Sequence, residues 1–426
     1  MSETSQGAIA PIPNAARLRI LVTLCAVYVV SQFFRASHAV VGPDLVREFG
    51  LSPADLGTLT GAFFFAFAAA QIPIGLLLDR FGARRTVASL LLVAILGAVM
   101  FARAESMIEL TVARVLMGLG CASVLVGAHV VCTRWFPPDR HATIAGIIIG
   151  GGEVGNILAA TPFAALSEAV GWRDGFLLTA LLAAGLTALA WFGVKDSPPG
   201  HPPHAAKGER LVDTLRGLRE VLTTPAIWPV IVIAFVGYSS VMCVFGLWGA
   251  PFLNDVYGLD PIARGNVMSV MAVSMLIGSV GFGPLDRYFD TRKGVVLTSC
   301  LALAACFGLL AMLQAPPLWA VTVLFALIGV LGGHRVAMMA HGRALFPMRL
   351  IGRTVTSVNT SMMGGVAILQ MVTGAIVGLV AVASGTGAEG GAYAVVFGSL
   401  AVIILVASLI YARAEDRRPS QDRRSH

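Results

Sequence analysis

The chain has 426 residues, of which 57% are hydrophobic and only 12% are charged. Soluble domains carry about 25% charged residues, and a water-soluble fold could not bury this much apolar surface, so that class of protein is excluded. The six cysteines all fall within apolar segments, without metal-ligand or secreted-framework spacing. We expect free thiols that pack as small hydrophobic groups.

Charge-free runs in the sequence are long enough to cross a lipid bilayer. Residues 56–78, 175–194, 221–253 and 265–285 reach or exceed the roughly 20 helical residues that the hydrocarbon core requires. No run shows the strict alternation of a membrane-spanning strand. Because backbone groups within lipid must be satisfied internally, the sequence predicts an all-α membrane protein.

Breaks between the apolar runs divide the chain into twelve predicted transmembrane helices. The predicted helices are 18–42, 55–78, 86–103, 107–134, 141–167, 174–194, 224–252, 263–285, 294–313, 317–342, 353–381 and 391–412. The first is too long for the apolar region of a signal peptide and is expected to stay as an anchor. The remaining segments are an N-terminal stretch, 1–17, a Pro- and charge-rich linker, 195–223, and a tail, 413–426.

The net charge of +7 is explained by topology rather than by a nucleic-acid partner. On the helix assignment above, nearly all Lys and Arg residues fall on one side of the membrane, whereas the other side holds only Arg47, Arg103, Arg173 and Arg264. By the positive-inside rule, both termini and the linker are cytoplasmic. We therefore predict a multi-pass protein of the inner (plasma) membrane.

The two halves, 18–194 and 224–412, repeat one another. Asp79-Arg80-Phe81 is matched by Asp286-Arg287-Tyr288 after 207 residues, and Phe136-Pro137 by Phe346-Pro347 after 210 residues. A near-constant offset indicates duplicated six-helix units. Parallel repeats of this kind place a substrate site at their interface, near the middle of the bilayer.

The loop after the second helix, Gly75-Leu-Leu-Leu-Asp-Arg-Phe-Gly-Ala-Arg-Arg85, resembles the signature of the major facilitator superfamily. Arg114-Val-Leu-Met-Gly-Leu-Gly120 and Gly171-Trp-Arg173 resemble two further landmarks of that family. The resemblance implies a major facilitator fold and a conformational latch formed by Asp79, Arg80, Gly82 and Arg84. The second copy, Asp286 and Arg287, departs from the pattern because Phe282 and Phe289 replace its glycines.

Glycines crowd the fifth and eleventh helices, for example at 150–152 and 364–365. Neither a strand nor a following Lys-Ser/Thr pair accompanies them, so a phosphate loop is not indicated. Close packing between helices is the better interpretation.

Ionisable residues at membrane depth carry the functional signal, because each costs about 2.5–3.5 kcal/mol at a helix centre unless it is compensated. The sequence has eight of them: Arg35, His38, Arg114, His129, Glu153, His334, Arg335 and His341. Arg35, Glu153 and Arg335 lie nearest to the middle of their helices.

The first helix, around Phe34-Arg-Ala-Ser-His38 and Pro43, is similar to that of the organophosphate:phosphate antiporters. In that family an Arg eight residues before the Pro binds phosphate, and Arg35 has this spacing to Pro43. The second binding Arg of the family does not carry over, since Cys243 stands eight residues before Pro251. Arg335 could supply a second positive charge, which suits a carboxylate, sulfonate or similar small anion.

Each assignment has a structural alternative. Arg35 and Arg335 could pair with Glu153 or with helix carbonyls, and buried histidines usually serve packing. We assign substrate binding to Arg35, His38, Asn156, Tyr238, His334, Arg335 and Asn359, and coupling to Glu153 and Arg114.

The sequence thus predicts a secondary transporter of a small organic anion that works by alternating access, with protons or a counter-anion as the driving partner. The alternatives are an efflux transporter of amphipathic compounds and a transporter-like membrane sensor. No nucleophile, metal or cofactor constellation is visible, so neither an enzyme nor a bound metal or cofactor is expected. We expect a monomer.

The predicted topology can be tested with reporter fusions. Fusions after Val194 and after Arg413 should both report the cytoplasm, because the Lys/Arg asymmetry places both points on that side. A periplasmic signal at either point would contradict the arrangement of twelve helices.

Overall fold

The computed structural model describes residues 14–137, 140–198, 211–313, 315–384 and 390–422. Within these ranges the regular elements are all helices, and twelve helical spans are long and apolar enough to cross a membrane. This confirms the predicted number and order of spans. The largest disagreement is in the seventh span, which continues to Tyr257 rather than ending at residue 252.

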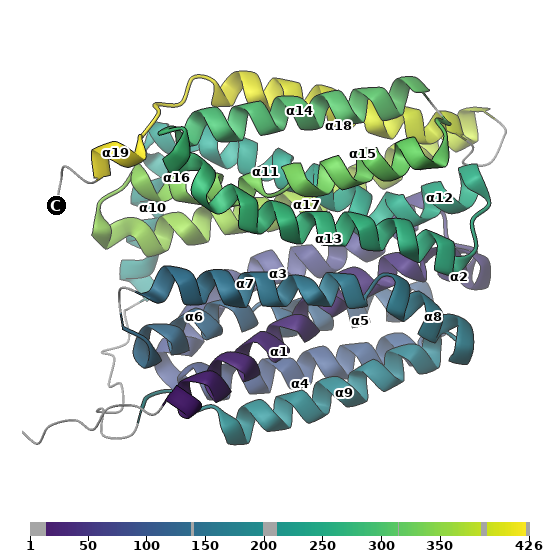
Figure 1. The fold of residues 1–426 in the computed structure, drawn as a ribbon. Helices are drawn as coiled ribbons and strands as arrows, with labels where there is room; N and C mark the ends of the chain where they lie inside the picture. The colour runs from purple at the N-terminus through teal and green to yellow at the C-terminus, as the bar shows by residue number, and fades with distance from the viewer. Residues whose placement is uncertain (1–13, 138–139, 199–210, 314, 385–389, 423–426) are drawn as a thin grey trace, which may run out of the picture.

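The helices form two bundles that lie one above the other in Figure 1. The N-terminal bundle consists of α1 (Asn14–Val40), α2 (Gly42–Phe49), α3 (Pro53–Phe81), α4 (Ala83–Arg103), α5 (Met107–Cys121), α6 (Val124–Trp135), α7 (His141–Leu158), α8 (Thr161–Val170) and α9 (Trp172–Gly193). Large apolar side chains such as Leu181 and Phe192 are exposed on its outer surface, as expected for a surface that faces lipid.

The C-terminal bundle follows α10 (Leu211–Thr223) and η2 (Pro225–Ile227). It consists of α11 (Trp228–Cys243), η3 (Val244–Trp248), α12 (Gly249–Tyr257), α13 (Pro261–Tyr288), α14 (Arg292–Leu313), α15 (Leu318–Leu331), α16 (His334–Ala344), η4 (Met348–Leu350), α17 (Ile351–Ser384), α18 (Gly390–Tyr411) and α19 (Pro419–Asp422). We call the end of the molecule that holds the start of α1 and α19 the terminal face, and the opposite end, with α2 and α12, the distal face (Figure 1).

Capping residues on the distal face fix where the helices begin. Ser52 and Asp55 form a reciprocal capping box at the start of α3, and Asp260 accepts a hydrogen bond from the backbone N–H of Ala263 at the start of α13. Proline follows both caps, at the helix position where its missing N–H matters least. Each cap contributes about 0.5–2 kcal/mol.

Four of the twelve spans are interrupted. The fourth breaks between α5 and α6 at Ala122–Ser123, and the tenth breaks between α15 and α16 at Gly332–Gly333, an offset of 210 residues that equals the offset of the Phe-Pro pairs. The fifth breaks at 159–160, and the seventh contains the π-helical turn η3. Breaks at equivalent places support the internal duplication and leave Arg335 in the first turn of α16.

On the terminal face, each bundle caps one of its own helices with a carboxylate that follows its last span. Asp196 accepts a hydrogen bond of 2.7 Å from the backbone N–H of Arg84 at the start of α4. Asp416 accepts bonds of 3.3 and 3.1 Å from the N–H groups of Arg292 and Lys293 at the start of α14. The repeat therefore extends to the polar ends of the helices.

The helix α10, which follows the central linker, is docked on the C-terminal bundle. Both oxygens of the Glu220 carboxylate accept hydrogen bonds from Arg349, at 2.5 and 2.9 Å, and these bonds lower the pKa of that carboxyl. Parts of the predicted N-terminal segment, linker and tail, namely 1–13, 199–210 and 423–426, lie outside the described residues.

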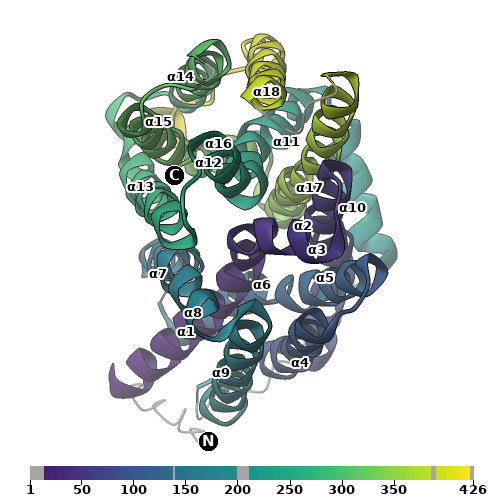
Figure 2. The ribbon, with the colours of Figure 1, turned by 90° about the vertical axis from the view of Figure 1, so that its right-hand side faces the viewer.

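The two bundles meet along two seams, seen from the distal face in Figure 2. In one seam α3 packs on α17, and a Cβ atom at Gly57 would lie 2.5 Å from the carbonyl oxygen of Gln370, so glycine is required there. In the other, Thr161 of α8 meets α13: its Oγ1 lies 2.9 Å from Asn266 Oδ1 and 2.8 Å from Ser269 Oγ. The break before Thr161 also frees its N–H to donate to Ser269 Oγ.

Thr161→Val should loosen the second seam on the distal face, because it removes both hydroxyl hydrogen bonds between the bundles. The bond to Asn266 is exposed and the bond to Ser269 is only partly buried, so we count about 1 kcal/mol for their joint loss. This predicts a roughly fivefold faster reaction of a cysteine introduced by Ala164→Cys with an impermeant thiol reagent. Thr179→Val is the matched control, since the Thr179 hydroxyl bonds only within its own helix. An unchanged labelling rate in the Thr161 variant would show that these bonds do not hold the seam.

Candidate functional site

Arg35 is a buried guanidinium on α1, with only 7% of the residue exposed. Its Cζ lies 5.0 Å from the centre of the Phe67 ring and 5.9 Å from that of Phe64. Its buried Nε has no hydrogen-bond partner, and no carboxylate among the described residues pairs with it. Aromatic faces attract a cation but do not neutralise it, so Arg35 retains an unbalanced positive charge.

Arg114 on α5 is a second buried guanidinium beside α1. It is fully buried, its Nη1 donates a hydrogen bond of 2.9 Å to the carbonyl of Phe34, and its Cζ lies 4.5 Å from the Phe63 ring centre. Its Nε and Nη2 have no partner. Arg114 thus ties α5 to α1 next to Arg35 and adds further positive charge to the N-terminal bundle.

Glu153 and Arg335 form an ion pair between the two bundles, from α7 to α16. Each is also held by its own bundle: Asn156 Nδ2 donates to Glu153 Oε2 at 2.6 Å, and Arg335 Nη2 donates to Ser279 Oγ at 2.9 Å. The carboxylate side chain is 1% exposed and the guanidinium side chain 16%. Glu153 therefore neutralises Arg335 and not Arg35.

Glycines allow close helix packing within each bundle on either side of this pair. A Cβ at Gly152 would lie 2.1 Å from the Tyr28 ring, and one at Gly155 would lie 2.2 Å from the carbonyl oxygen of Val29, so α7 lies directly on α1. In the other bundle, a Cβ at Gly278 would lie 2.2 Å from the carbonyl oxygen of Val330. This contact sets Ser279 beside the broken tenth span and Arg335.

Two tyrosines connect the charged groups into one cluster. Tyr28 of α1 is buried and interacts electrostatically with Arg35, Arg335, Glu153 and Tyr238. The Tyr238 ring centre lies 5.5 Å from the Cζ of Arg335. Tyr28 therefore lies among Arg35, Glu153, Arg335 and Tyr238 at the interface between the bundles.

The other predicted binding residues lie in different surroundings. His38 is buried on α1, and neither ring nitrogen makes a hydrogen bond of normal geometry, although the ring lies beside the backbone of Arg35 and Gly246. His334 is buried within the C-terminal bundle: its Nδ1 bonds to the Leu331 carbonyl, and its Nε2 lies against Gly237.

Asn359 makes no hydrogen bond to the charged cluster among the described residues. It is half-buried on α17 and has no hydrogen-bond partner among the described residues. Asn156, by contrast, belongs to the cluster through its bond to Glu153. Of the predicted polar residues, Asn156 and Tyr238 are thus the ones that contact the ion pair.

The predicted latch residues lie on the terminal face. Asp79 and Arg80 are exposed in the last turn of α3, and Arg80 stacks on Phe81 with its Cζ 5.2 Å from the ring centre. Gly82 has a φ of +80°, which favours glycine, and a Cβ there would lie 2.5 Å from Asp196 Oδ2. Arg84 stacks on Trp191 and bonds to Asp196 through its backbone.

In the second copy of this motif, Arg287 is exposed, and Asp286 is buried with an oxygen 3.6 Å from Arg292 Nε. Loss of the glycines in this copy has therefore not removed its carboxylate from the packed end of the bundle. The sequence analysis did not identify the capping carboxylates Asp196 and Asp416. Each lies next to another charged residue just after the last span of its bundle, so neither stands out in the sequence.

Reasoning from the sequence also missed Tyr28, Ser279 and Gln32 as members of the site's surroundings. Tyr28 and Gln32 are buried on α1, about two turns and one turn before Arg35, and Gln32 Oε1 has no hydrogen-bond partner. Their signal was available as polar atoms within an apolar helix. Ser279 offered no comparable signal, because serines are common in membrane helices and only its distance to Arg335 distinguishes it.

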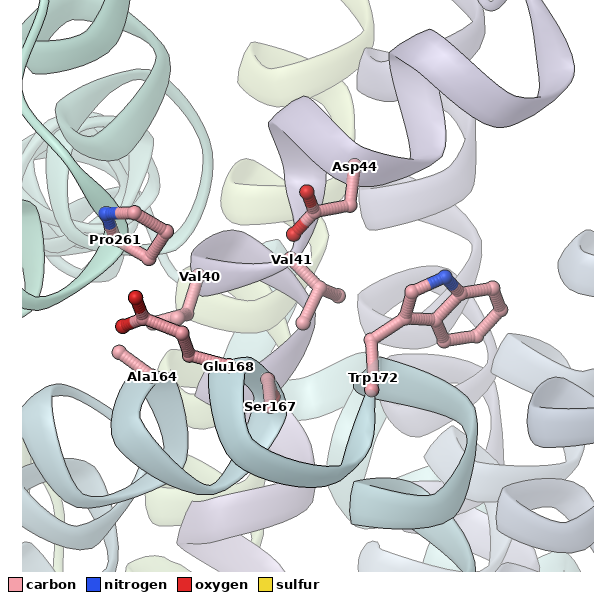
Figure 3. A pocket seen from close by; sticks show the side chains of 9 residues that line it. Val40, Val41, Asp44, Ala164, Ser167, Glu168, Trp172 and Pro261 are labelled. Carbon is pink, nitrogen blue, oxygen red and sulfur yellow. The ribbon is translucent and has the colours of Figure 1, made fainter.

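A pocket of about 260 Å³ lies near the distal face, lined by Val40, Val41, Asp44, Ala164, Ser167, Glu168, Gly171, Trp172 and Pro261. Figure 3 shows the Asp44 and Glu168 carboxylates among its walls. Two carboxylates oppose the entry of an anion, and none of the predicted binding residues lines this pocket.

Two of the relatives similar in sequence to this chain are named as transporters. A probable sulfoacetate transporter of Cupriavidus necator is 26% identical over 289 residues, covering 65% of this chain and 66% of that protein. A nitrate/nitrite transporter of Picosynechococcus is 28% identical over 309 residues, covering 64% of this chain and 56% of that protein. The aligned regions thus span less than two thirds of the length of either relative.

The fold is also that of a solved transporter. The crystal structure of a bacterial homologue of the human lysosomal transporter Spinster, inward-facing and unoccupied, has a TM-score of 0.73 and 21% identity, with 94% of this chain and 97% of that chain covered. Residues 24–369 match the family model of the Major Facilitator Superfamily. With its twelve spans in two repeated bundles, this chain belongs to the major facilitator superfamily and is a membrane transporter rather than an enzyme.

Proposed function

We propose that this protein carries a small organic anion across the inner (plasma) membrane by alternating access between its two bundles. The observation that supports this most directly is Arg35, a buried guanidinium without a counter-charge beside the interface. The sulfoacetate and nitrate transport named for its relatives agrees with an anionic substrate. The Lys/Arg asymmetry supports a cytoplasmic location for both termini and for the linker at 195–223.

The energetics favour a ligand at Arg35. An ionised group within a membrane is expensive unless it is paired, and the carboxylate nearest in the cluster, Glu153, is already bound to Arg335. A carboxylate, sulfonate or phosphate can accept two parallel hydrogen bonds from a guanidinium. Such a substrate would supply the missing negative charge and satisfy the unpartnered Nε.

Two rival functions remain distinguishable from this proposal. An efflux transporter of amphipathic compounds would use an apolar cavity, whereas the cluster here consists of two arginines, a carboxylate and two tyrosines. A transporter-like sensor would bind the anion without net flux. Uptake of labelled anion into proteoliposomes separates the sensor from the transporter.

Coupling is assigned to Glu153, with Arg114 as a supporting group. Glu153 joins the two bundles, so its loss of charge would break the tie to Arg335 and alter the contact between them. Protonation would remove the charge of Glu153, whereas a counter-anion that binds Arg335 would compete with Glu153 for that guanidinium; either event would weaken the tie. Arg114 would transmit it within the N-terminal bundle through its bond to the Phe34 carbonyl, beside Arg35. A monomer suffices, since the cluster draws on one chain.

Arg35→Lys should weaken anion binding at least about tenfold, roughly 1.4 kcal/mol, and Arg35→Ala should abolish it. An ammonium is a point charge and reproduces the planar guanidinium geometry poorly. Equilibrium binding to purified protein, screened over carboxylates, sulfonates and phosphates, measures the effect.

Arg47→Lys is the matched control, because Arg47 lies on the next helix and its side chain is 72% exposed. Its binding should equal that of the unmodified protein. Folded Arg35→Ala protein that binds the same anions with unchanged affinity would remove Arg35 from the site and withdraw the main support for the proposal.

Glu153→Gln should abolish uphill uptake driven by a proton gradient yet preserve exchange between two pools of substrate. The neutral amide cannot take up and release the coupled proton, while the path for the substrate remains. Parallel uptake and counterflow assays in proteoliposomes provide the measurement. Equal loss of both modes would identify Glu153 as a purely structural partner of Arg335.

A further inference from the structure

Arg335 is bound to Glu153 through only part of its guanidinium. Its Nη2 donates both to Glu153 Oε1 and to Ser279 Oγ. Its Nε and Nη1 have no hydrogen-bond partner among the described residues, and neither is among the polar atoms that are sealed from solvent. The 16% of the side chain that is exposed therefore includes the edge that could receive a second anion.

The charges of the cluster do not balance when Glu153 is paired with Arg335. The cluster has two guanidiniums, Arg35 and Arg335, but one carboxylate, which is bound to Arg335. A substrate with one negative charge would therefore neutralise Arg35 and leave Arg335 paired with Glu153. A second anionic group on the open edge of Arg335 would share the single positive charge of that guanidinium with the Glu153 carboxylate, so the two anions compete for it electrostatically.

Resting on the function proposed above, we propose that Arg335 is a second substrate-binding group and that Glu153 is its resident ligand. An anionic group arriving at the open Nε/Nη1 edge competes with the Glu153 carboxylate. The site therefore selects substrates with an anionic group at each end, such as sulfocarboxylates and dicarboxylates: one end binds Arg35 in the N-terminal bundle and the other binds Arg335 in the C-terminal bundle.

The supports of the pair are arranged for such an exchange. Ser279 and the Tyr238 ring hold Arg335 from its own bundle, so the guanidinium stays in position when Glu153 leaves. Asn156 lies one helical turn from Glu153 and bonds to its other oxygen, so the released carboxylate keeps a polar partner. Binding of the second anionic group would replace a contact between the bundles by a contact through the substrate.

The test compares anions that differ only in their number of charged groups. Equilibrium binding of sulfoacetate is measured against acetate and methanesulfonate, and binding of succinate against butyrate, on the full-length purified protein. Glu153→Gln should tighten the binding of sulfoacetate and succinate by about tenfold, roughly 1.4 kcal/mol, because their competitor is lost. The singly charged anions should change far less. Arg335→Gln should lower the binding affinity of each doubly charged anion to that of its singly charged counterpart.

Glu168→Gln is the matched control: it removes an exposed carboxylate from the neighbouring helix α8, and it should leave all affinities unchanged. If Glu153→Gln does not purify as folded protein, the double variant Glu153→Gln/Arg335→Gln decides. It should lose the preference for doubly charged anions and keep acetate binding near that of the unmodified protein.

Three results would overturn the inference: no preference for doubly charged anions in the unmodified protein, unchanged or weaker sulfoacetate binding in folded Glu153→Gln, or a preference that survives in the double variant. Each leaves the proposed function standing as long as Arg35→Ala still abolishes binding. Failure of the proposed function shows itself separately, as anion binding that does not depend on Arg35.

Discussion

A charge at membrane depth must find its counter-charge within the protein or on a ligand. The structure meets this constraint at Arg335, where Glu153 from the other bundle supplies the charge, and leaves it unmet at Arg35 and Arg114. Buried polar groups without partners are rare in folded proteins. Arg35 and Arg114 carry such groups, and both contact or lie on α1 of the N-terminal bundle.

Packing and charge depend on each other in this arrangement. Gly152 and Gly155 let α7 lie against α1, and Gly278 lets α13 lie against the broken tenth span. Small residues allow such close contact between membrane helices. Each of these contacts lies within one bundle, so the glycines fix the surroundings of Glu153 and of Arg335 separately, and the ion pair joins the two packed units.

The sequence alone predicted the twelve spans and the duplication, because both follow from long apolar runs and repeated motifs. It also identified the ionisable residues, since a charge within an apolar helix is conspicuous. Their pairing could not be predicted: whether Glu153 meets Arg35 or Arg335 depends on how two bundles pack. Ser279 and Asp196 were missed for the same reason, because a common residue type becomes informative only when its neighbour in space is known.

The carboxylates Asp196 and Asp416 cap helices of their own bundles. Within the described residues, each of these helix ends is capped by a carboxylate of its own bundle, which comes after that bundle's last membrane span. Each bundle is thus closed at this face by its own chain segment. Substitutions at the interface between the bundles can therefore alter the contacts there without uncapping either helix.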